Sequence, residues 1–347
     1  MTPLIGLLVA FAPTQVTPRG FFGVEPQVVA EGKRVFVAYG ANNGLYVQRS
    51  DDVGTKFAAP VTLPTSGNLA LGMRRGPRIA LAGKSLVVSA IYGKEGGGND
   101  GDLFAWRSSD SGATWKGPSR VSDVPKAARE GLHAMAASKL GLLACTWLDL
   151  RNKGTEIWVS TSKDGGATWT KNVCAYRSPS GTVCECCHPS IAFAPDGKLH
   201  VMFRNWLDGA RDMYLISSTD GGKTFGPGQK LGVGTWPLNA CPMDGGSLSV
   251  RSDGTIDTIW RRGKEIFVCV PGQEEQELGT GTQPWSTSLG GTWTATWLLE
   301  DGRVHAQNLF GESSLTTGTN PVIVNTKGKA LVFWADRSGR IWTQPFP

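Results

Sequence analysis

An eight-residue pattern that occurs four times constrains the fold of this chain more than any other feature. The copies follow Ser-x-Asp-x-Gly-x-Thr/Lys-Trp/Phe and cover residues 50–57, 108–115, 162–169 and 218–225. Their starts lie 58, 54 and 56 residues apart. An Asp side chain can accept hydrogen bonds from N–H groups just after it, and Gly tolerates positive φ. Each copy is therefore predicted to form a tight turn.

Apolar segments before the turns predict the rest of the repeating unit. One such segment directly precedes each copy, at residues 45–47, 103–106, 157–159 and 213–216. Two further strand-like segments lie upstream in every unit, so the turn joins the third strand to the fourth. A four-stranded unit of about 55 residues that recurs along a chain is typical of a propeller blade.

The C-terminal third of the chain lacks the turn pattern but keeps the strand pattern. Three more first strands are predicted to begin near residues 247, 285 and 321. The sequence thus predicts an all-β propeller with seven four-stranded blades, with six as the alternative. The last unit has only three strands, so a segment near the N-terminus is expected to supply its outer strand. Residues 21–347 form one propeller domain in this interpretation.

Composition agrees with a β fold and excludes several classes of protein. The 347 residues include 46 Gly and 13 Trp, and only 18% are charged, which disfavours helical bundles. The net charge of +6 is spread along the chain, and no Lys/Arg run exceeds two, so nucleic acid is not an expected partner. No apolar run reaches the roughly 18 residues of a membrane span.

The first 20 residues have two interpretations. Residues 4–12 are apolar, and Ala10-Phe11-Ala12 has the A-x-A form of a signal-peptidase site, although no basic side chain precedes it. A signal peptide would export the protein to the periplasm or the extracellular space, which is the expected location. The alternative is that this segment forms the closing outer strand.

The four turns resemble the Asp-box, or BNR, repeats of the sialidase superfamily. The resemblance covers residues 22–235 by motif, and it implies a propeller in which the boxes are structural. It also implies an enzyme of the glycoside hydrolase type, if the chain is an enzyme. The stretch Cys184-x-Cys186-Cys187-His188-Pro189 is similar to CxCC stretches of sialidase-like bacterial propellers.

The sequence departs from standard sialidases, which have six blades, three substrate-binding arginines, a nucleophilic Tyr and an Asp acid/base. The Phe-Arg-Ile-Pro element is absent, and Pro77-Arg78-Ile79 matches it only in part. The nucleophilic Tyr belongs in a late blade, whereas the last tyrosine here is Tyr214. Sialic-acid cleavage by the usual mechanism is therefore not expected.

Chemically active residues gather in the loops that a propeller places opposite the Asp boxes. Guanidinium groups pair well with carboxylates, so a cluster of arginines predicts a glycan or another small anionic ligand. The candidates are Arg75, Arg78, Arg204, Arg211 and Arg262 for binding, and Glu130, Asp149, Asp208 and Asp244 for acid/base catalysis. Alternatively, each arginine simply pairs with a nearby carboxylate. His200 and His305 lie within strand patterns and are expected to be structural.

Cysteines and histidines near the starts of the third, fourth and fifth units predict a second kind of site. Entry loops of adjacent blades approach one another near the axis, and thiolate with imidazole suits zinc or copper(I). The candidate ligands are Cys184, Cys186, Cys187, His188, Cys241 and His133. Disulfides are the alternative, for example Cys174 with Cys184 or Cys187 with Cys241, and free buried thiols are another.

Three functions therefore stay open for what we expect to be a monomer. The first is a glycosidase or lyase of unusual mechanism, and the second is a propeller that binds a glycan without catalysis. The third is a metal or redox protein built on the cysteines. In each case the site is expected near the axis, on the face opposite the Asp boxes, between units two and five.

Overall fold

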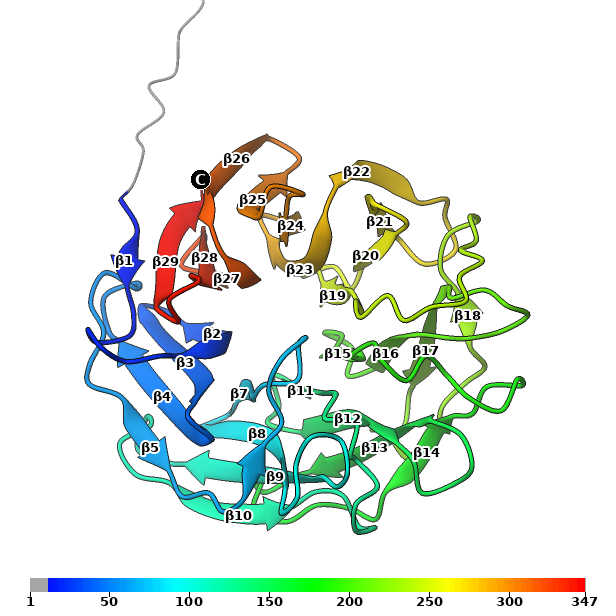
Figure 1. Cartoon of the computed structure of the whole chain (residues 1–347), viewed down its shortest axis with the longest axis horizontal. Coiled ribbons are helices and arrows are strands. Elements are labelled where there is room, and N and C mark those ends of the chain that lie inside the picture. The colour runs from blue at the N-terminus through cyan, green and yellow to red at the C-terminus, as the bar shows by residue number, and fades with distance from the viewer. Residues whose placement is uncertain (1–11, 347) are drawn as a thin grey trace, which may run out of the picture.

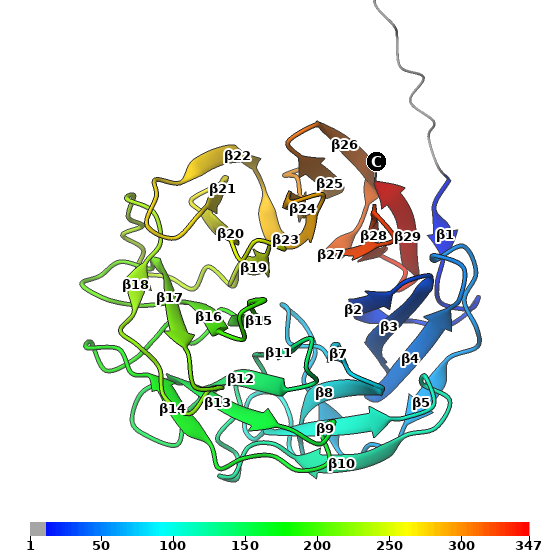
Figure 2. The same cartoon turned by 180° about the vertical axis from the view of Figure 1, so that it is seen from behind.

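The computed structural model describes residues 12–346, which form strands and turns but no helix. Seven antiparallel sheets surround a central axis, as the two opposite views show (Figures 1 and 2). The predicted all-β propeller with seven blades is confirmed. The six-bladed alternative is wrong.

The first four blades contain the Asp boxes. Blade 1 consists of β2 (Val24–Glu31), β3 (Arg34–Ala41), β4 (Gly44–Ser50) and β5 (Val61–Leu63); blade 2 of β6 (Asn68–Leu69), β7 (Arg78–Ala82), β8 (Ser85–Gly93), β9 (Asp102–Ser108) and β10 (Lys116–Arg120); blade 3 of β11 (His133–Ala137), β12 (Leu143–Asp149), β13 (Glu156–Ser162) and β14 (Val173–Tyr176); blade 4 of β15 (Ser190–Phe193), β16 (Leu199–Arg204), β17 (Met213–Ser218) and β18 (Gln229–Lys230). The short β6 is an addition to blade 2 that pairs with the end of β8.

The last three blades keep the same strand order without the boxes. Blade 5 consists of β19 (Ser247–Val250), β20 (Ile256–Arg262), β21 (Glu265–Cys269) and β22 (Gln276–Thr280); blade 6 of β23 (Thr282–Leu289), β24 (Thr292–Leu298), β25 (Arg303–Asn308) and β26 (Gly311–Thr317); blade 7 of β27 (Thr319–Thr326), β28 (Lys329–Ala335), β29 (Ile341–Phe346) and β1 (Thr14–Gln15).

The N-terminal β1 closes the ring. Thr14 pairs with Thr343 and Gln15 with Trp342, so the chain's first strand becomes the fourth strand of blade 7 (Figure 1). The following residue continues this contact, because the Val16 N–H donates to the Ile341 carbonyl over 2.8 Å. Closure leaves the last blade without the unpaired edge that a ring otherwise exposes. The apolar segment 4–12 lies almost wholly outside the described residues, so the interpretation as a signal peptide is unchanged.

Second strands lie in the middle of their blades and are covered on both faces by neighbouring blades. Every residue of β12 and of β24 is buried. Burial on both faces agrees with the largely apolar sequence of β12, whereas β24 buries three threonines between its apolar residues. Large indoles, among them Trp147 and Trp297, fill the space between blades with 0% and 1% of their surface exposed.

The Asp boxes form the predicted turns. In the third box, Asp164 accepts hydrogen bonds from the Ser162 hydroxyl and from the N–H of Thr168. The Ser162 hydroxyl in turn accepts the Gly166 N–H over 2.9 Å, and Gly166 has a φ of 85°. Although burial acts in the opposite direction, these hydrogen bonds, with that of the Thr168 hydroxyl, lower the pKa of Asp164 to about 2. The Asp164 carboxylate is thus occupied by hydrogen bonds within its own turn.

Strand direction places the loops on two faces. Each blade is antiparallel, so its first hairpin turn and its Asp box lie at one end of the strands. The loops that enter the first strand and join the second to the third lie at the other end. We call these two ends the box face and the entry face. Among residues 12–346, no helix is long and apolar enough to span a membrane.

Candidate functional site

Six of the seven inner strands line a small cavity on the axis. Its volume is about 140 Å³, and its walls include Arg78 and Trp285. A loop of blade 2 crosses the axis at the entry face. Arg74 in this loop donates from Nη2 to the carbonyls of Gln283 over 2.7 Å and Pro321 over 2.9 Å, which belong to blades 6 and 7. The loop is thereby fastened across the ring.

Four basic side chains lie buried around the axis. Burial lowers the pKa of both Arg74 and Arg78 to about 10. Burial and the nearby Arg78 also hold the pKa of His133 and of His188 well below the usual range, so both imidazoles are neutral at pH 7. Nitrogen atoms of all four residues lack protein partners in the described chain. The cavity has room for a few water molecules, the usual partners of such groups.

Several of the predicted binding arginines are structural. Arg204 donates to the carbonyls of Arg211, Asp244 and Arg261 and is 1% exposed. Arg262 pairs with Glu275 over 2.5 Å. The alternative of pairing with a nearby carboxylate therefore describes Arg262, whereas Arg204 connects loops and strands of blades 4 and 5 through backbone carbonyls.

The predicted acid/base residues are spread over different environments. Asp149 is buried and accepts hydrogen bonds from Arg151 and from the Trp147 indole. Asp208 is exposed on a turn with a φ of 52°. Asp244 accepts from Arg261 over 3.0 Å and from the N–H of Gln283 over 2.8 Å. The structure does not bring these three carboxylates together with Glu130.

A cleft beside the axis contains two of the predicted residues. It has a volume of about 310 Å³ and lies on the entry face between β6 and the entry loop of blade 3. Arg75, Arg129 and Glu130 line it, together with the glycine turn 96–98. Arg75 donates from Nε to the Glu130 carbonyl over 2.7 Å, which holds the two side chains at the same wall. Arg129 is exposed and has no ion-pair partner among residues 12–346.

Glu130 is the titratable group with an unusual environment in this cleft. Burial raises the pKa of Glu130, and the nearby Glu185 adds to the effect, whereas Arg75 and Arg129 act in the opposite direction. No described residue donates a hydrogen bond to its carboxyl group, which is half-buried. A carboxyl group in this state is ready for a ligand or for proton transfer.

The neighbouring loop owes its shape to a buried carboxylate. Glu25, with a φ of 55°, accepts hydrogen bonds from the N–H groups of Gly72, Arg75 and Gly76. The entry loop of blade 3 favours glycine at position 131, because its φ is 76° and a Cβ atom there would lie 2.8 Å from the Ala70 Cβ and 2.9 Å from the Arg75 side chain. Backbone contacts therefore set the position of Arg75.

A second cavity adjoins this cleft at the outer part of blade 2. It measures about 500 Å³ and shares Gly93 and Asp100 with the cleft. Phe104 provides a partly exposed ring there, and Lys94 provides a positive charge. We call the cleft and this cavity together the blade-2 groove. An aromatic face and cationic groups along one groove suit an extended polar ligand.

Three of the predicted metal ligands form a compact cluster. The Sγ atoms of Cys184, Cys186 and Cys187 lie 3.3 to 4.0 Å apart, and all three side chains are buried. Cys241 is exposed, and Cys174 lies beside Glu156, so neither is in the cluster. All seven cysteines are free, and neither of the alternative disulfides, Cys174 with Cys184 or Cys187 with Cys241, is formed.

The predicted histidine ligands have other partners. His188 Nε2 lies 2.9 Å from the Gly246 carbonyl, and His133 Nε2 lies 3.0 Å from the Ser89 hydroxyl. Within the described chain, the group of potential metal ligands that meets in space consists of the three cysteines alone. His200 and His305 contact neighbouring strands, as expected for structural histidines.

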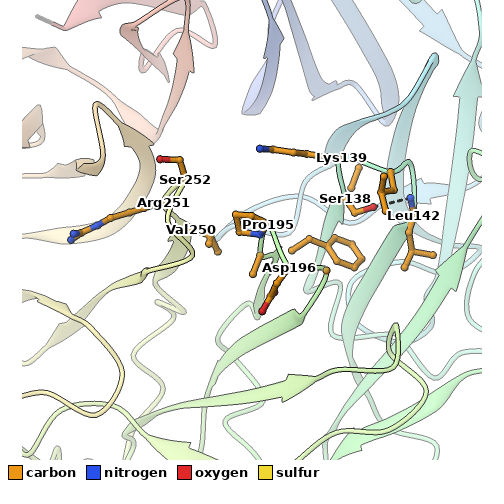
Figure 3. A pocket seen from close by; sticks show the side chains of 13 residues that line it. Ser138, Lys139, Leu142, Pro195, Asp196, Val250, Arg251 and Ser252 are labelled. Carbon is orange, nitrogen blue, oxygen red and sulfur yellow. Dashed lines mark hydrogen bonds between the residues drawn. The ribbon is translucent and has the colours of Figure 1, made fainter.

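A pocket of about 460 Å³ lies on the box face (Figure 3). First hairpin turns of blades 3, 4 and 5 form its walls, with Ser138, Asp196 and Arg251 among the lining residues. Their polar groups are already bonded: Ser138 accepts the Leu142 N–H, Arg251 pairs with Asp257, and Asp196 pairs with Lys198. The cleft of the blade-2 groove is smaller than this pocket, but it contains more charged side chains that lack a partner within the described residues. We therefore take the groove as the candidate site.

A family model described as the BNR repeat-like domain matches residues 90–314. The chain belongs to this family. The resemblance to BNR propellers of the sialidase superfamily is thereby confirmed, together with the seven-bladed fold. No curated protein matches the sequence.

Solved structures similar to this BNR propeller have varied activities. An α-L-arabinanase of Penicillium chrysogenum, complexed with arabinobiose, has a TM-score of 0.58 at 15% identity and covers 96% of this chain and 97% of its own. A virginiamycin B lyase of Staphylococcus aureus has a TM-score of 0.60 at 12% identity and covers 96% of this chain and 98% of its own. An ulvan lyase bound to GlcA(1-4)Rha3S has a TM-score of 0.57 at 12% identity and covers 94% of this chain and 95% of its own. Identities this low show the shared fold alone.

Sequence reasoning on this BNR propeller missed Arg129, Glu25 and the role of Glu185. Glu25 is the second residue of the inner strand β2, and Arg129 lies in the entry loop four residues before the inner strand β11. Their only signal in the sequence is a charged side chain near the start of an inner strand. Glu185 lies between Cys184 and Cys186, and nothing in the sequence indicates that its charge acts on Glu130 in the neighbouring blade.

Proposed function

We propose that this BNR propeller binds an anionic glycan in the blade-2 groove. The observation that carries the proposal is the half-buried Glu130 carboxyl beside two guanidinium groups, one of which has no partner in the described chain. An acidic sugar would offer a carboxylate or sulfate to Arg129 and Arg75. Hydroxyl groups of the sugar would supply the hydrogen bonds that Glu130 lacks.

The dimensions of the groove support a saccharide. The two adjoining cavities of about 310 and 500 Å³ lie in the range of pockets that hold small ligands. Phe104 offers a partly exposed ring on which a sugar can stack. Among proteins of this fold, the arabinanase structure contains arabinobiose and the ulvan lyase structure a GlcA-containing saccharide.

Glycoside hydrolysis is a second candidate function, favoured by the Glu130 environment. A carboxyl group with a raised pKa can act as a general acid, and Glu185 is close enough to contribute to that shift. Glu185 would then be the second carboxylate that hydrolysis requires. This assignment departs from sialidases, since it uses no tyrosine.

A binding screen tests the proposal. The full chain should bind oligosaccharides that contain uronic or sialic acid, and it should bind their neutral counterparts at least about tenfold more weakly. Raised ionic strength should weaken the binding, because the charged contacts are partly exposed. Equal affinity for acidic and neutral sugars, or no binding to either, would overturn it. Release of reducing ends from a bound sugar by the wild type but not by Glu130→Gln would establish hydrolysis.

A further inference from the structure

The three clustered thiols have no part in the proposed glycan binding. We propose that Cys184, Cys186 and Cys187 bind one thiophilic d¹⁰ cation, Cu(I) in preference to Zn(II). They open blade 4 on the entry face, where the segment before β15 turns toward the axis. Their exposed fractions are 0%, 7% and 1%, so the site is enclosed except near Cys186.

The distances between the sulfur atoms suit a metal better than a disulfide. The Cys184–Cys187, Cys184–Cys186 and Cys186–Cys187 separations are 3.3, 3.6 and 4.0 Å. A disulfide needs about 2.05 Å. Thiolates that share one ion at about 2.3 Å lie roughly 3.8 Å apart. The observed triangle therefore has the size of a metal–thiolate site.

The ligand set favours copper(I). Within the described chain, no histidine, carboxylate or further cysteine joins the three thiols as a fourth ligand. Structural zinc sites use four such ligands, whereas soft sulfur ligands select Cu(I). The remaining neighbour is the side chain of Met243, which packs against the cluster. A thioether beside three thiols adds another soft group and no hard one.

A guanidinium group provides the charge that bound thiolates need. Arg211 donates from Nη1 to the Cys184 Sγ over 3.0 Å, and its Nε donates to the Leu238 carbonyl. The Arg211 side chain also lies over the Trp206 ring, 4.9 Å from its centroid. Arg211 is thus held in place next to the sulfur atoms. A buried thiolate is costly unless such a cation or a metal compensates it.

Metal binding here involves no change of oxidation state. Each thiol that becomes a ligand releases its proton to solvent, and Cu(I) enters and leaves as Cu(I). None of the three cysteines lines the Arg129 and Glu130 cleft, so copper binding can be measured without any glycan.

The test titrates Cu(I) into the reduced full chain without oxygen, in competition with a coloured Cu(I) chelator. We expect one copper per chain. Cys186→Ser removes a ligand and should weaken Cu(I) binding by more than about tenfold. Roughly tenfold is the loss expected when a residue that only hydrogen-bonds to a ligand is removed. Cys241→Ser and Cys269→Ser are matched controls that should leave the affinity unchanged. A Zn(II) titration should show weaker binding than Cu(I).

Alkylation of the wild type keeps the test valid if a variant does not fold. In the folded chain, bound Cu(I) should slow the alkylation of Cys184, Cys186 and Cys187 relative to the copper-free chain, and it should leave the exposed Cys241 as reactive as before. The proposal is overturned if the chain takes up no copper, if Cys186→Ser binds it as tightly as the wild type, or if Cys241 is protected instead. Tighter binding of Zn(II) than of Cu(I) would overturn the choice of metal.

Discussion

Arginine side chains near the entry face divide into groups according to what their guanidinium groups contact. Arg74 and Arg204 donate to backbone carbonyls of other blades, and Arg262 pairs with a buried carboxylate. Arg75 and Arg129 instead line the open cleft of the blade-2 groove. The residue type is the same in all cases, so the function of each arginine depends on the loop that carries it. This is why the sequence could propose an arginine cluster but could not select its members.

The raised pKa of Glu130 makes a prediction for stability against pH. The folded state favours the protonated carboxyl, so its contribution is fully present below the ordinary pKa near 4.5 and is lost as pH rises through the raised value. A Gln side chain cannot ionise, so its contribution to the free energy of unfolding does not change with pH. Glu130→Gln should therefore become more stable relative to the wild type between pH 4 and pH 7. Thermal unfolding of both proteins across that range measures it, and a difference that does not change with pH would contradict it.

The Asp boxes are predicted to matter for stability and not for ligand binding. Asp164→Ala removes acceptors for Ser162 and Thr168 and should lower the free energy of unfolding by about 1 kcal/mol. Asp51→Ala is the matched control, since Asp51 makes only an exposed ion pair with Arg49. Urea denaturation of the two variants gives the comparison. Loss of glycan affinity in stably folded Asp164→Ala would count against the structural assignment.

At the scale of strands and blades, most of the fold could be read from the sequence. The four boxes lie in phase, and segments such as residues 292–298 form the expected second strands. The short β6 carried no signal, because two residues show no periodicity and their pairing depends on the end of β8. The predicted cysteine cluster formed where its members are adjacent in the chain. Cys241 lies on another blade, and sequence could not give its distance.

The closing strand makes a prediction that concerns a single element. Residues 14–17 contribute the β1 pairs, the buried Val16, and a hydrogen bond from the Ile341 N–H to the Thr17 hydroxyl. A chain that begins at residue 18 should have a free energy of unfolding lower by about 2 kcal/mol or more than a chain that begins at residue 12. Equal unfolding temperatures for the two truncated chains would show that blade 7 does not need this strand.

At the scale of the whole molecule, the candidate site lies off the axis. Inner strands meet around a cavity of about 140 Å³, and the Arg74 loop crosses it at the entry face. Topology placed Arg78, His133 and His188 near the axis, where all three side chains are buried around a cavity smaller than the cleft. The open space lies instead above blade 2, where β6 and the glycine turn 96–98 widen the entry face.

The measurement that tests this account most directly is calorimetric titration of an acidic oligosaccharide into the wild type and two arginine variants. Arg129→Ala removes the unpaired cation of the cleft, and Arg337→Ala removes another exposed arginine on blade 7. We predict at least about tenfold weaker binding for Arg129→Ala, about 1.4 kcal/mol, and unchanged binding for Arg337→Ala. If Arg129→Ala binds the sugar as the wild type does, the blade-2 groove is not the site.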